Sequence, residues 1–424
     1  MTATIQTSFL TFANPYAPAP SPSSSEVVMS WSSTQQTIDG FGATLNNFDW
    51  GSATLPFDDT LADEVFDPIL GIGISLVRIG ISPEADLAWC NPTDITKAAA
   101  RGARVFGCPW TAPAGYKSNG SEINGGSLNV GSYGDWSDDL TNWVTLVQST
   151  TGVLPIGVLM QNEPDFSAGY ESMLMSGSEA AAFAKVLGPK LHAISAKLIV
   201  GSFSSWDNLH STVSAIEADG AALAATDYYA TNQYYGTPSV GGVRPLWETE
   251  VSILGGGFEN NIANAIFWSK KIHVALVDGE VSAWLYWWLL GPYYPGDAPG
   301  DGDQQWLISP PYTKAKRFYG LGQWSKFVRP GWVRTAIAGG PSNTYCTSFK
   351  NTSTGAFAIV IINDSGSSQS FGLSINGAVP GTITPYRTSN TENIVGLTGL
   401  TPTGVRASVT VAANSITTFT GMAS

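Results

Sequence analysis

A cluster of polar residues directly after an apolar run is the first feature that could do chemistry. Residues 156–160 read IGVLM and are followed by Gln161, Asn162, Glu163 and Pro164. Buried polar groups are costly unless they are paired, and proline ends a strand because it lacks a backbone donor. A glutamate at such a strand tip can act as a general acid/base, and the asparagine beside it can hydrogen-bond a sugar hydroxyl. A helix N-cap or a turn would use the same residue types, so this segment alone leaves both interpretations open.

A second carboxylate cluster, residues 246–250 (LWETE), ends another strand-like run. The two-residue periodicity of a strand puts Glu248 and Glu250 on one face. Glu250 is the better candidate for a nucleophile because it lies nearer the carboxyl end, and Glu248 is expected to support it or to form an ion pair. Exposed edge glutamates are disfavoured on a parallel strand that is covered on both faces. Two such carboxylates, about 5–5.5 Å apart, suit glycoside hydrolysis with retention, in which one protonates the leaving oxygen and the other attacks the anomeric carbon.

The elements that must position these carboxylates alternate between strand and helix from Thr37 to about Phe327. Strands are expected at 37–45, 73–80, 103–110, 156–162, 198–204, 227–234, 244–251 and 281–288, with helices such as 135–149, 178–197 and 259–277 between them. Alternation of this kind predicts an α/β fold, a (β/α)8 TIM barrel. Since functional groups of such barrels sit at the carboxyl ends of the strands, strands four and seven should bring both clusters to one face.

The texture of the sequence changes after Pro330. Short alternating strands separated by Gly, Asn and Ser appear at 344–349, 355–363, 369–375 and 406–419. This pattern is typical of a β-sandwich. Strand-like runs at 3–12 and 26–32 are expected to complete that sandwich, because chain termini often meet. We therefore expect N-terminal strands within 1–36, the barrel in 37–329 and a β-sandwich side domain in 330–424.

The composition narrows the classes of partner. Lys and Arg total 20 against 33 Asp and Glu, which gives a net charge of −13. A strongly acidic surface disfavours nucleic acid and anionic membranes, and no apolar run is long enough to span a bilayer. Three cysteines without a CxxC pair predict neither a zinc site nor a disulfide framework. No metal or cofactor is expected.

The abundance of aromatic residues points to a different partner. The 424 residues include 15 Trp and 15 Tyr, whose rings can stack on uncharged sugars. We expect a polysaccharide substrate and a secreted, monomeric enzyme, although the first ten residues, MTATIQTSFL, have no basic region followed by an apolar core as in a signal peptide.

Segments spread over most of the chain carry a joint pattern. They are 36–42 (QTIDGFG), 109–119 (PWTAPAGYKSN), 160–164 (MQNEP), 247–250 (WETE) and 325–331 (SKFVRPG). Together they resemble glycoside hydrolase family 30, within the large clan of retaining (β/α)8 hydrolases, and look most like its bacterial xylanase branch. The resemblance implies that Glu163 is the acid/base and Glu250 the nucleophile. It also implies a β-sandwich attached to the barrel and assembled from both termini.

Further site residues follow from the resemblance. Arg78 matches an arginine that holds the nucleophile ionised, as a nearby fixed cation would, with a structural ion pair as the alternative. Tyr234 matches a tyrosine that hydrogen-bonds the nucleophile, although Asn232 stands where bacterial xylanases of the family more often have histidine. Trp287 matches the aromatic floor of the subsite for the attacked sugar, with barrel packing as the alternative. Trp110 is a second candidate for a wall of that subsite.

The loop after strand eight bears on the choice of sugar. The xylanase branch commonly binds a glucuronate side group with an arginine there. In this chain, residues 289–297 read LLGPYYPGD, and no Lys or Arg lies between residue 289 and Lys314. We therefore expect endo-action on β-1,4-xylan without strict glucuronate dependence, with Tyr293 able to stack or to donate a neutral hydrogen bond. A β-1,6-glucanase or β-1,6-galactanase stays open.

Two other classes of protein are weighed against a wall-degrading hydrolase. A non-catalytic carbohydrate-binding protein on the same scaffold has no need of two carboxylates. A glucosylceramidase-like hydrolase should show an amphipathic surface for a membrane, and no basic amphipathic stretch is visible.

Overall fold

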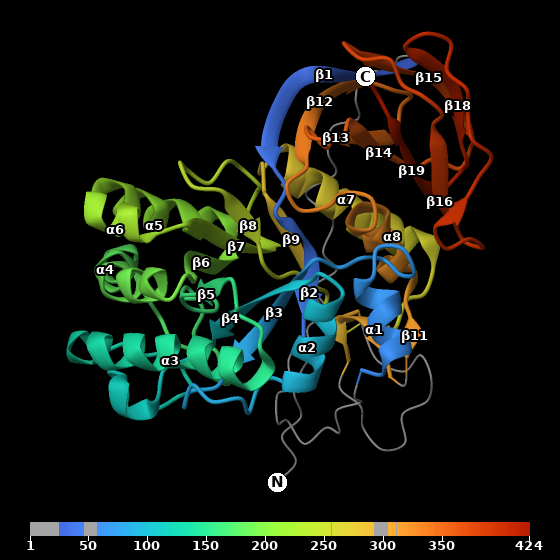
Figure 1. Cartoon of the computed structure of the whole chain (residues 1–424). Coiled ribbons are helices and arrows are strands. Elements are labelled where there is room, and N and C mark those ends of the chain that lie inside the picture. Colours follow the sequence, from blue (N-terminus) through green and yellow to red (C-terminus); the bar gives the residue numbers. More distant parts are fainter. Residues whose placement is uncertain (1–24, 46–56, 256, 292–303, 311) are drawn as a thin grey trace.

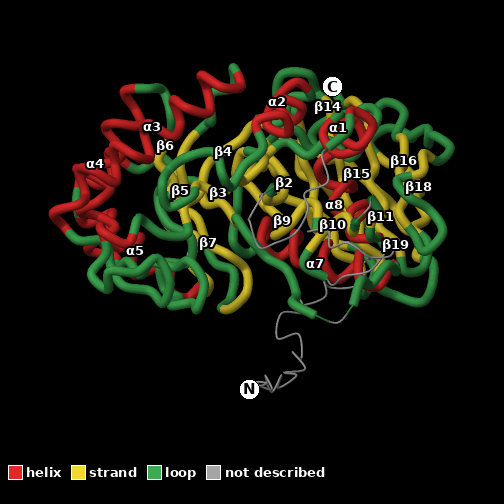
Figure 2. Tube along the Cα trace, turned by 90° about the horizontal axis from the view of Figure 1, so that it is seen from below, coloured by secondary structure: helices red, strands yellow, loops and turns green. Residues whose placement is uncertain are grey.

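The computed structural model describes residues 25–45, 57–255, 257–291, 304–310 and 312–424. The chain folds into a β/α barrel and a β-rich side domain that lie against each other (Figure 1). Turned by 90°, the barrel has helices α3, α4 and α5 outside strands β5, β6 and β7 (Figure 2).

Eight parallel strands close the barrel in chain order. They are β2 (Gly40–Thr44), β3 (Leu76–Ile81), β4 (Arg104–Pro109), β5 (Gly157–Leu159), β6 (Lys197–Ser205), β7 (Tyr228–Tyr235), β8 (Leu246–Glu248) and β9 (Ala283–Leu290). Each strand pairs with the next, and β9 pairs with both β8 and β2. Two short strands, β10 (Trp306–Ser309) and β11 (Thr313–Lys314), extend the sheet beside β9. Each of the eight predicted strands overlaps a barrel strand, so the predicted (β/α)8 fold is confirmed.

Helices follow the barrel strands and cover them. They are α1 (Asp59–Phe66), α2 (Pro92–Ala100), α3 (Tyr133–Thr151), α4 (Gly177–Ala193), α5 (Trp206–Ala218), α6 (Gly220–Ala225), α7 (Ile262–Val277) and α8 (Lys316–Ser325), with 3-10 turns at Ala114–Tyr116 and Val130–Ser132. The start of α4 is set by a capping box between Ser176 and Glu179. The end of α3 is set by Gly152, whose φ of 73° is the left-handed conformation that glycine adopts readily. The predicted helix 178–197 ends early, because Ser195 has a φ of 63° and β6 begins two residues later.

The side domain is the predicted β-rich body, and all nine of its strands belong to one sheet. They are β1 (Glu26–Thr37), β12 (Val333–Gly339), β13 (Thr344–Lys350), β14 (Ala356–Asn363), β15 (Gln369–Asn376), β16 (Thr384–Thr388), β17 (Val395–Gly396), β18 (Arg406–Val411) and β19 (Ser415–Met422). The strand order is β17-β16-β19-β14-β13-β12-β1-β15-β18. Side chains of β15 and β18 share an apolar core with those of β14 and β19, so the sheet curls until its two halves face each other.

The first described strand, β1, lies inside this sheet. It runs antiparallel to β12 and parallel to β15, so it joins the two halves of the curl. The strand-like run at 26–32 is therefore part of the side-domain sheet, whereas the run at 3–12 lies outside the described residues. The division of the chain at residues 36 and 330 stays a prediction.

The outer face of the curled sheet packs on the barrel through α7 and α8. Tyr345 and Phe349 of β13 belong to the same apolar cluster as the barrel core. The Trp324 ring of α8 meets Phe349 edge-on at 6.2 Å, and the Phe327 ring packs at a tilt against Tyr386, with 4.7 Å between the ring centres. The Gln323 side chain adds a buried hydrogen bond to Thr388 across the junction. The side domain is thus attached by a continuous core and not by a linker alone.

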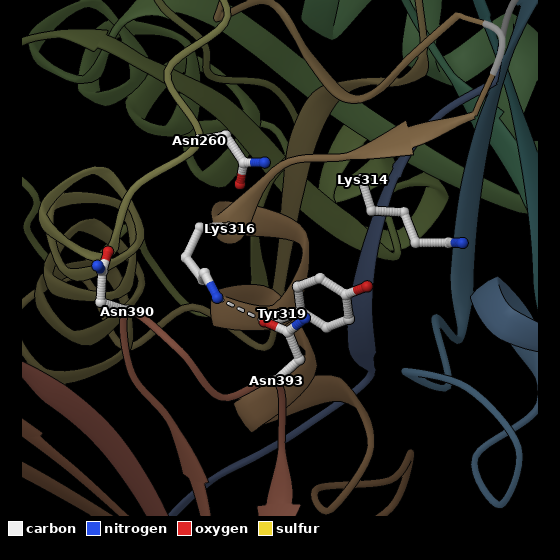
Figure 3. A pocket seen from close by; sticks show the side chains of 6 residues that line it. All are labelled: Asn260, Lys314, Lys316, Tyr319, Asn390 and Asn393. Carbon is white, nitrogen blue, oxygen red and sulfur yellow. Dashed lines mark hydrogen bonds between the residues drawn. The ribbon is translucent and has the colours of Figure 1, made fainter. Parts of the chain in front are cut away.

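A polar cavity of about 270 Å³ opens at the same junction (Figure 3). Its lining residues are Asn260, Lys314, Lys316, Tyr319, Asn390 and Asn393. The Lys316 ammonium donates to Asn393 Oδ1 at 2.6 Å, and burial lowers the pKa of Lys316. Lys314 points away and pairs with Glu64 of α1 at 2.5 Å. Because both cations bind protein acceptors, the cavity is a polar seam between the two bodies.

The buried position of β1 predicts how much it contributes to stability. Met29 has 0% exposure, and we expect Met29→Ala to lower the free energy of unfolding by about 2–5 kcal/mol, because it leaves a cavity in the side-domain core. Ser33→Ala, at an exposed position of the same strand, should change it by less than about 0.5 kcal/mol. Denaturant unfolding measures both values. Equal stability of the two variants would mean that β1 is not a structural strand of this sheet.

Candidate functional site

The residues predicted to form the site meet at the carboxyl ends of the barrel strands. Asn162 and Glu163 follow β5, and Glu250 follows β8. Arg78 lies in β3, where all six residues are buried. The remaining candidates are Tyr234 in β7, Trp287 in β9 and Trp110 just after β4. Tyr293 lies outside the described residues.

Glu250 is bound by two donors from other strands. Its Oε2 forms an ion pair with the Arg78 guanidinium, and its Oε1 accepts a hydrogen bond from the Tyr234 hydroxyl at 2.9 Å. The exposed fraction is 0% for Arg78 and 6% for Glu250. An ionised carboxylate only accepts hydrogen bonds, so a cation and a phenol are suitable partners for it. The Glu250 carboxylate, just after β8, is thus held by donors on two sides.

Arg78 reaches further neighbours around the site. Its Nη2 donates to Asn162 Oδ1 at 2.6 Å and to Cys108 Sγ at 3.1 Å. The guanidinium carbon lies 4.7 Å from the centre of the Trp110 ring and 5.9 Å from that of Trp287. One arginine therefore connects four of the predicted site residues.

Glu163 has a different environment. Its side chain is nearly buried, and Oε1 accepts a hydrogen bond from Asn232 Nδ2 at 3.2 Å. Burial raises the pKa of Glu163, and the nearby charge of Glu250 raises it further. The two predicted catalytic carboxyls are therefore close enough to interact electrically while having different partners.

The backbone of Glu163 is strained. Its φ is 37°, in the left-handed region that residues other than glycine rarely adopt. The peptide N–H of Glu163 donates to Ser202 O at 2.9 Å, and Ser202 itself has a φ of 72°. Such strain persists only where the surrounding structure holds it, and it is common at functional sites. Pro164, which lacks an N–H, follows directly in the loop after β5.

Glu248 hydrogen-bonds backbone groups beside Glu250. It has no exposed surface, and its two oxygens accept from the peptide N–H of Glu250 at 3.1 Å and of Leu285 at 3.2 Å. Burial raises the pKa of Glu248 well above its ordinary value. Glu248 therefore links the end of β8 to β9 next to Glu250, which agrees with the supporting role expected of it.

Aromatic rings form a continuous wall beside the carboxyls. Trp110 lies 5.8 Å from Trp287, Trp287 stacks on Trp288 at 5.3 Å, and Trp288 lies 6.3 Å from Trp306. Trp89 meets Trp110 edge-on at 6.2 Å. All but Trp89 belong to one buried core cluster, with Trp89 packed against it. Trp287 thus packs in the core and lies near Arg78, and its role as the floor of a sugar subsite stays a prediction.

Several neighbours of the carboxyls were not predicted as site residues. Cys108 directly precedes the Pro-Trp pair of β4, and burial raises the pKa of its thiol to about 11. Ser202 lies in β6, and Thr249 lies between Glu248 and Glu250 at the end of β8. Asn232 was noticed only because it departs from the histidine of the family pattern. Their positions at strand tips were visible in the sequence, but their hydrogen bonds depend on the closed barrel.

The described residues also bear on metal binding and on membrane spanning. Within these ranges, no group of three His, Cys, Asp or Glu side chains is arranged to hold a metal ion. Likewise, no helix of the described part combines the length and the apolar character needed to cross a bilayer.

Comparisons with known proteins place this geometry in a wider group. No family model matches the chain. The glucuronoxylanase XynC of Bacillus subtilis is 27% identical over 416 residues, which cover 93% of this chain and 91% of that protein. The crystal structure of a family 30 subfamily 8 xylanase from Clostridium acetobutylicum superimposes with a TM-score of 0.82 at 24% identity, covering 94% of this chain and all of the other.

The resemblance to glycoside hydrolase family 30 is confirmed. The chain is a glycoside hydrolase. A second solved structure, the endo-β1,6-glucanase BT3312, has a TM-score of 0.71 at 20% identity and covers 96% of this chain and 95% of its own. The shared fold of a glycoside hydrolase thus occurs in proteins named for different polysaccharides.

The buried ion pair predicts the effect of removing its cation. We expect Arg78→Ala to lower the free energy of unfolding by about 3–5 kcal/mol, because it leaves Glu250 buried without its partner. Arg406→Ala, which removes a half-exposed arginine paired with Glu26, should cost no more than about 1 kcal/mol. Denaturant unfolding at neutral pH compares the two. An Arg78→Ala protein as stable as the wild type would contradict the ion pair.

Proposed function

We propose that this glycoside hydrolase is a retaining endo-β-1,4-xylanase that does not strictly depend on glucuronate, with Glu163 as acid/base and Glu250 as nucleophile. The observation that carries the proposal is the contrast between the two carboxyls. Glu250 is paired with a buried cation and a phenol, whereas Glu163 is nearly buried, accepts an amide N–H and has a raised pKa. When two carboxyls have such different environments, the one that stays protonated can act as the acid and the one paired with a cation can act as the nucleophile.

In the first step, Glu250 Oε attacks the anomeric carbon while Glu163 gives its proton to the leaving oxygen. The bond from the anomeric carbon to that oxygen breaks, and an ester bond from the sugar to Glu250 forms. The raised pKa of Glu163 keeps it protonated near neutral pH, as this step requires. Arg78 and Tyr234 hold Glu250 in place for the attack.

In the second step, the ionised Glu163 takes a proton from a water molecule, whose oxygen attacks the anomeric carbon. The ester bond breaks, Glu250 is released as a carboxylate, and Glu163 is again protonated. Departure of the negative charge from Glu250 in the first step favours ionisation of Glu163, because repulsion between the two carboxylates is then relieved. The Trp110 and Trp287 rings can stack on the sugar during both steps.

Support for xylan comes from the relatives named above, one a glucuronoxylanase and one a xylanase. Weak dependence on glucuronate is supported by cations of the described residues that already bind protein acceptors. Arg78 binds Glu250, Lys117 donates to Ser172 O at 2.7 Å, and Arg317 donates to Glu259 O at 3.0 Å. Arg244 precedes β8, at the opposite end of the barrel, and donates to Leu223 O at 2.8 Å.

A β-1,6-glucanase is the second candidate, favoured by the fold shared with the endo-β1,6-glucanase. Action as a secreted monomer remains part of the proposal. A polymeric wall substrate is met outside the cell, which is consistent with secretion.

The two glutamates can be tested by substitution. We expect Glu163→Gln to lower kcat on xylan by about 100- to 10,000-fold, because a general acid/base contributes this much. Glu250→Gln should abolish turnover, because the glycosyl ester cannot form. Reducing-sugar release measures both, and thermal unfolding checks that the variants are folded. Turnover of Glu250→Gln close to that of the wild type would exclude Glu250 as nucleophile.

A small external nucleophile then distinguishes the two roles. Azide should restore part of the activity of Glu250→Gly by attacking the anomeric carbon from the vacated side, which gives a glycosyl azide of inverted configuration. With Glu163→Ala, azide should react with the glycosyl ester and give the retained configuration. NMR of the products reads the configuration. The same configuration from both variants would contradict the assignment.

The proposed tolerance for undecorated xylan predicts a small substrate preference. We expect kcat/KM on glucuronoxylan to exceed that on its carboxyl-reduced form by less than about tenfold. A charge-assisted hydrogen bond to the carboxylate, at about 1.5–3 kcal/mol, would give about ten- to a hundredfold. A ratio within or above that range would show that a cation binds the uronate. Faster cleavage of β-1,6-glucan than of either xylan would favour the second candidate.

A further inference from the structure

Asn232 is a buried amide between the two strands that carry the glutamates. It lies in β7, has no exposed surface, and donates from Nδ2 to Glu163 Oε1 at 3.2 Å. Its Oδ1 accepts from the Ser202 hydroxyl at 2.9 Å, and the Thr249 hydroxyl lies 3.1 Å from the same oxygen. Strands β6, β7 and the tip of β8 therefore all contribute to one small network that ends on Glu163.

The ionised form of Glu163 favours one orientation of the amide. If the amide turned over, its oxygen would face Glu163 Oε1, and two acceptors would meet when Glu163 is ionised. The NH2 group would then replace Oδ1 as the partner of Ser202 and Thr249, and the hydrogen bond that Ser202 donates would be lost. With the donor toward the carboxyl, the amide hydrogen-bonds the Glu163 carboxylate and accepts from Ser202 at the same time.

We infer that Asn232 is a positioning residue for Glu163, which it orients so that Oε1 is held as an acceptor and the acid proton is carried on Oε2. The inference rests on the acid/base role proposed above and names the group that makes this role specific to one oxygen. Because an amide does not titrate, the hydrogen bond to Oε1 is present in both protonation states of Glu163. It stabilises the carboxylate that the second step of hydrolysis needs.

The other groups around Glu163 act in different directions. Those that interact with it electrically are Glu250, Asp165, Arg78, Cys108, Tyr170 and Tyr234. Glu250 and Asp165 raise the pKa of Glu163, whereas Arg78 and the Asn232 hydrogen bond lower it. The pKa values of the Cys108 thiol and of the two tyrosines are raised by burial, so these three groups stay neutral where Glu163 titrates. Loss of the amide donor should therefore raise the pKa of Glu163.

The test is the pH profile of kcat/KM, whose alkaline limb reports the acid in the free enzyme. We expect Asn232→Ala to move that limb to higher pH by about one unit, because a hydrogen bond to a charged group is lost. At the acidic plateau, kcat/KM should fall about ten- to a hundredfold on xylan. It should fall much less on an aryl xylobioside with a dinitrophenol leaving group, which needs no proton to depart. If the role of Asn232 were merely structural, its loss would lower kcat/KM equally on both substrates and would leave the alkaline limb in place.

Matched variants separate the possible outcomes. Asn264→Ala removes another buried amide of the barrel domain, one that hydrogen-bonds Gln304 and Glu259 and not Glu163, and should not move the limb. If Asn232→Ala does not fold, Ser202→Ala decides, because it removes the donor to Oδ1 and should displace the limb in the same direction. An unmoved limb in the folded variant overturns the inference. Substantial activity of Glu163→Gln would instead overturn the acid/base assignment itself.

Discussion

The buried ion pair between Arg78 and Glu250 is the constraint on which the site depends. A guanidinium with no exposed surface must be compensated, and its four partners come from three strand ends: Glu250 after β8, Asn162 after β5, and Cys108 and the ring of Trp110 at the end of β4. None of these contacts is local in sequence. Closure of the barrel therefore brings Glu250 to Arg78 and compensates the charge of the arginine. Arg78 in turn fixes the position of the Glu250 carboxylate.

The second carboxyl is controlled by the opposite means. Glu163 accepts an amide hydrogen bond, its pKa is raised by burial and by the charge of Glu250, and its backbone is held in a left-handed conformation. A strained residue needs rigid surroundings, and the pairing of its peptide N–H with Ser202 supplies part of them. The side domain contributes rigidity from outside, because its sheet packs on α7 and α8, the helices that follow the last two barrel strands.

Much of this could be predicted from residue patterns. All eight barrel strands were located because parallel strands buried on both faces are apolar runs, and a run that ends in QNEP or WETE marks its own tip. Both glutamates were found in this way, with the family resemblance naming their roles, whereas Arg78 followed from the resemblance. Asn232 could not be interpreted, because an asparagine at a strand tip has no preferred partner until the neighbouring strands are known. The continuous tryptophan wall was likewise visible only as separate residues.

The sequence by itself determined the class of fold, the positions of the two carboxylates and the resemblance to glycoside hydrolase family 30, since periodicity, strand-ending polar residues and motif spacing are local or nearly local properties. Only the tertiary structure decided which groups touch. It assigned Glu248 to the backbone of Glu250 and Leu285, joined β1 to β12 and β15, and aimed the Asn232 amide at Glu163. The physical reason is that hydrogen bonds and pKa values depend on distances of a few ångströms between strand ends that are far apart along the chain.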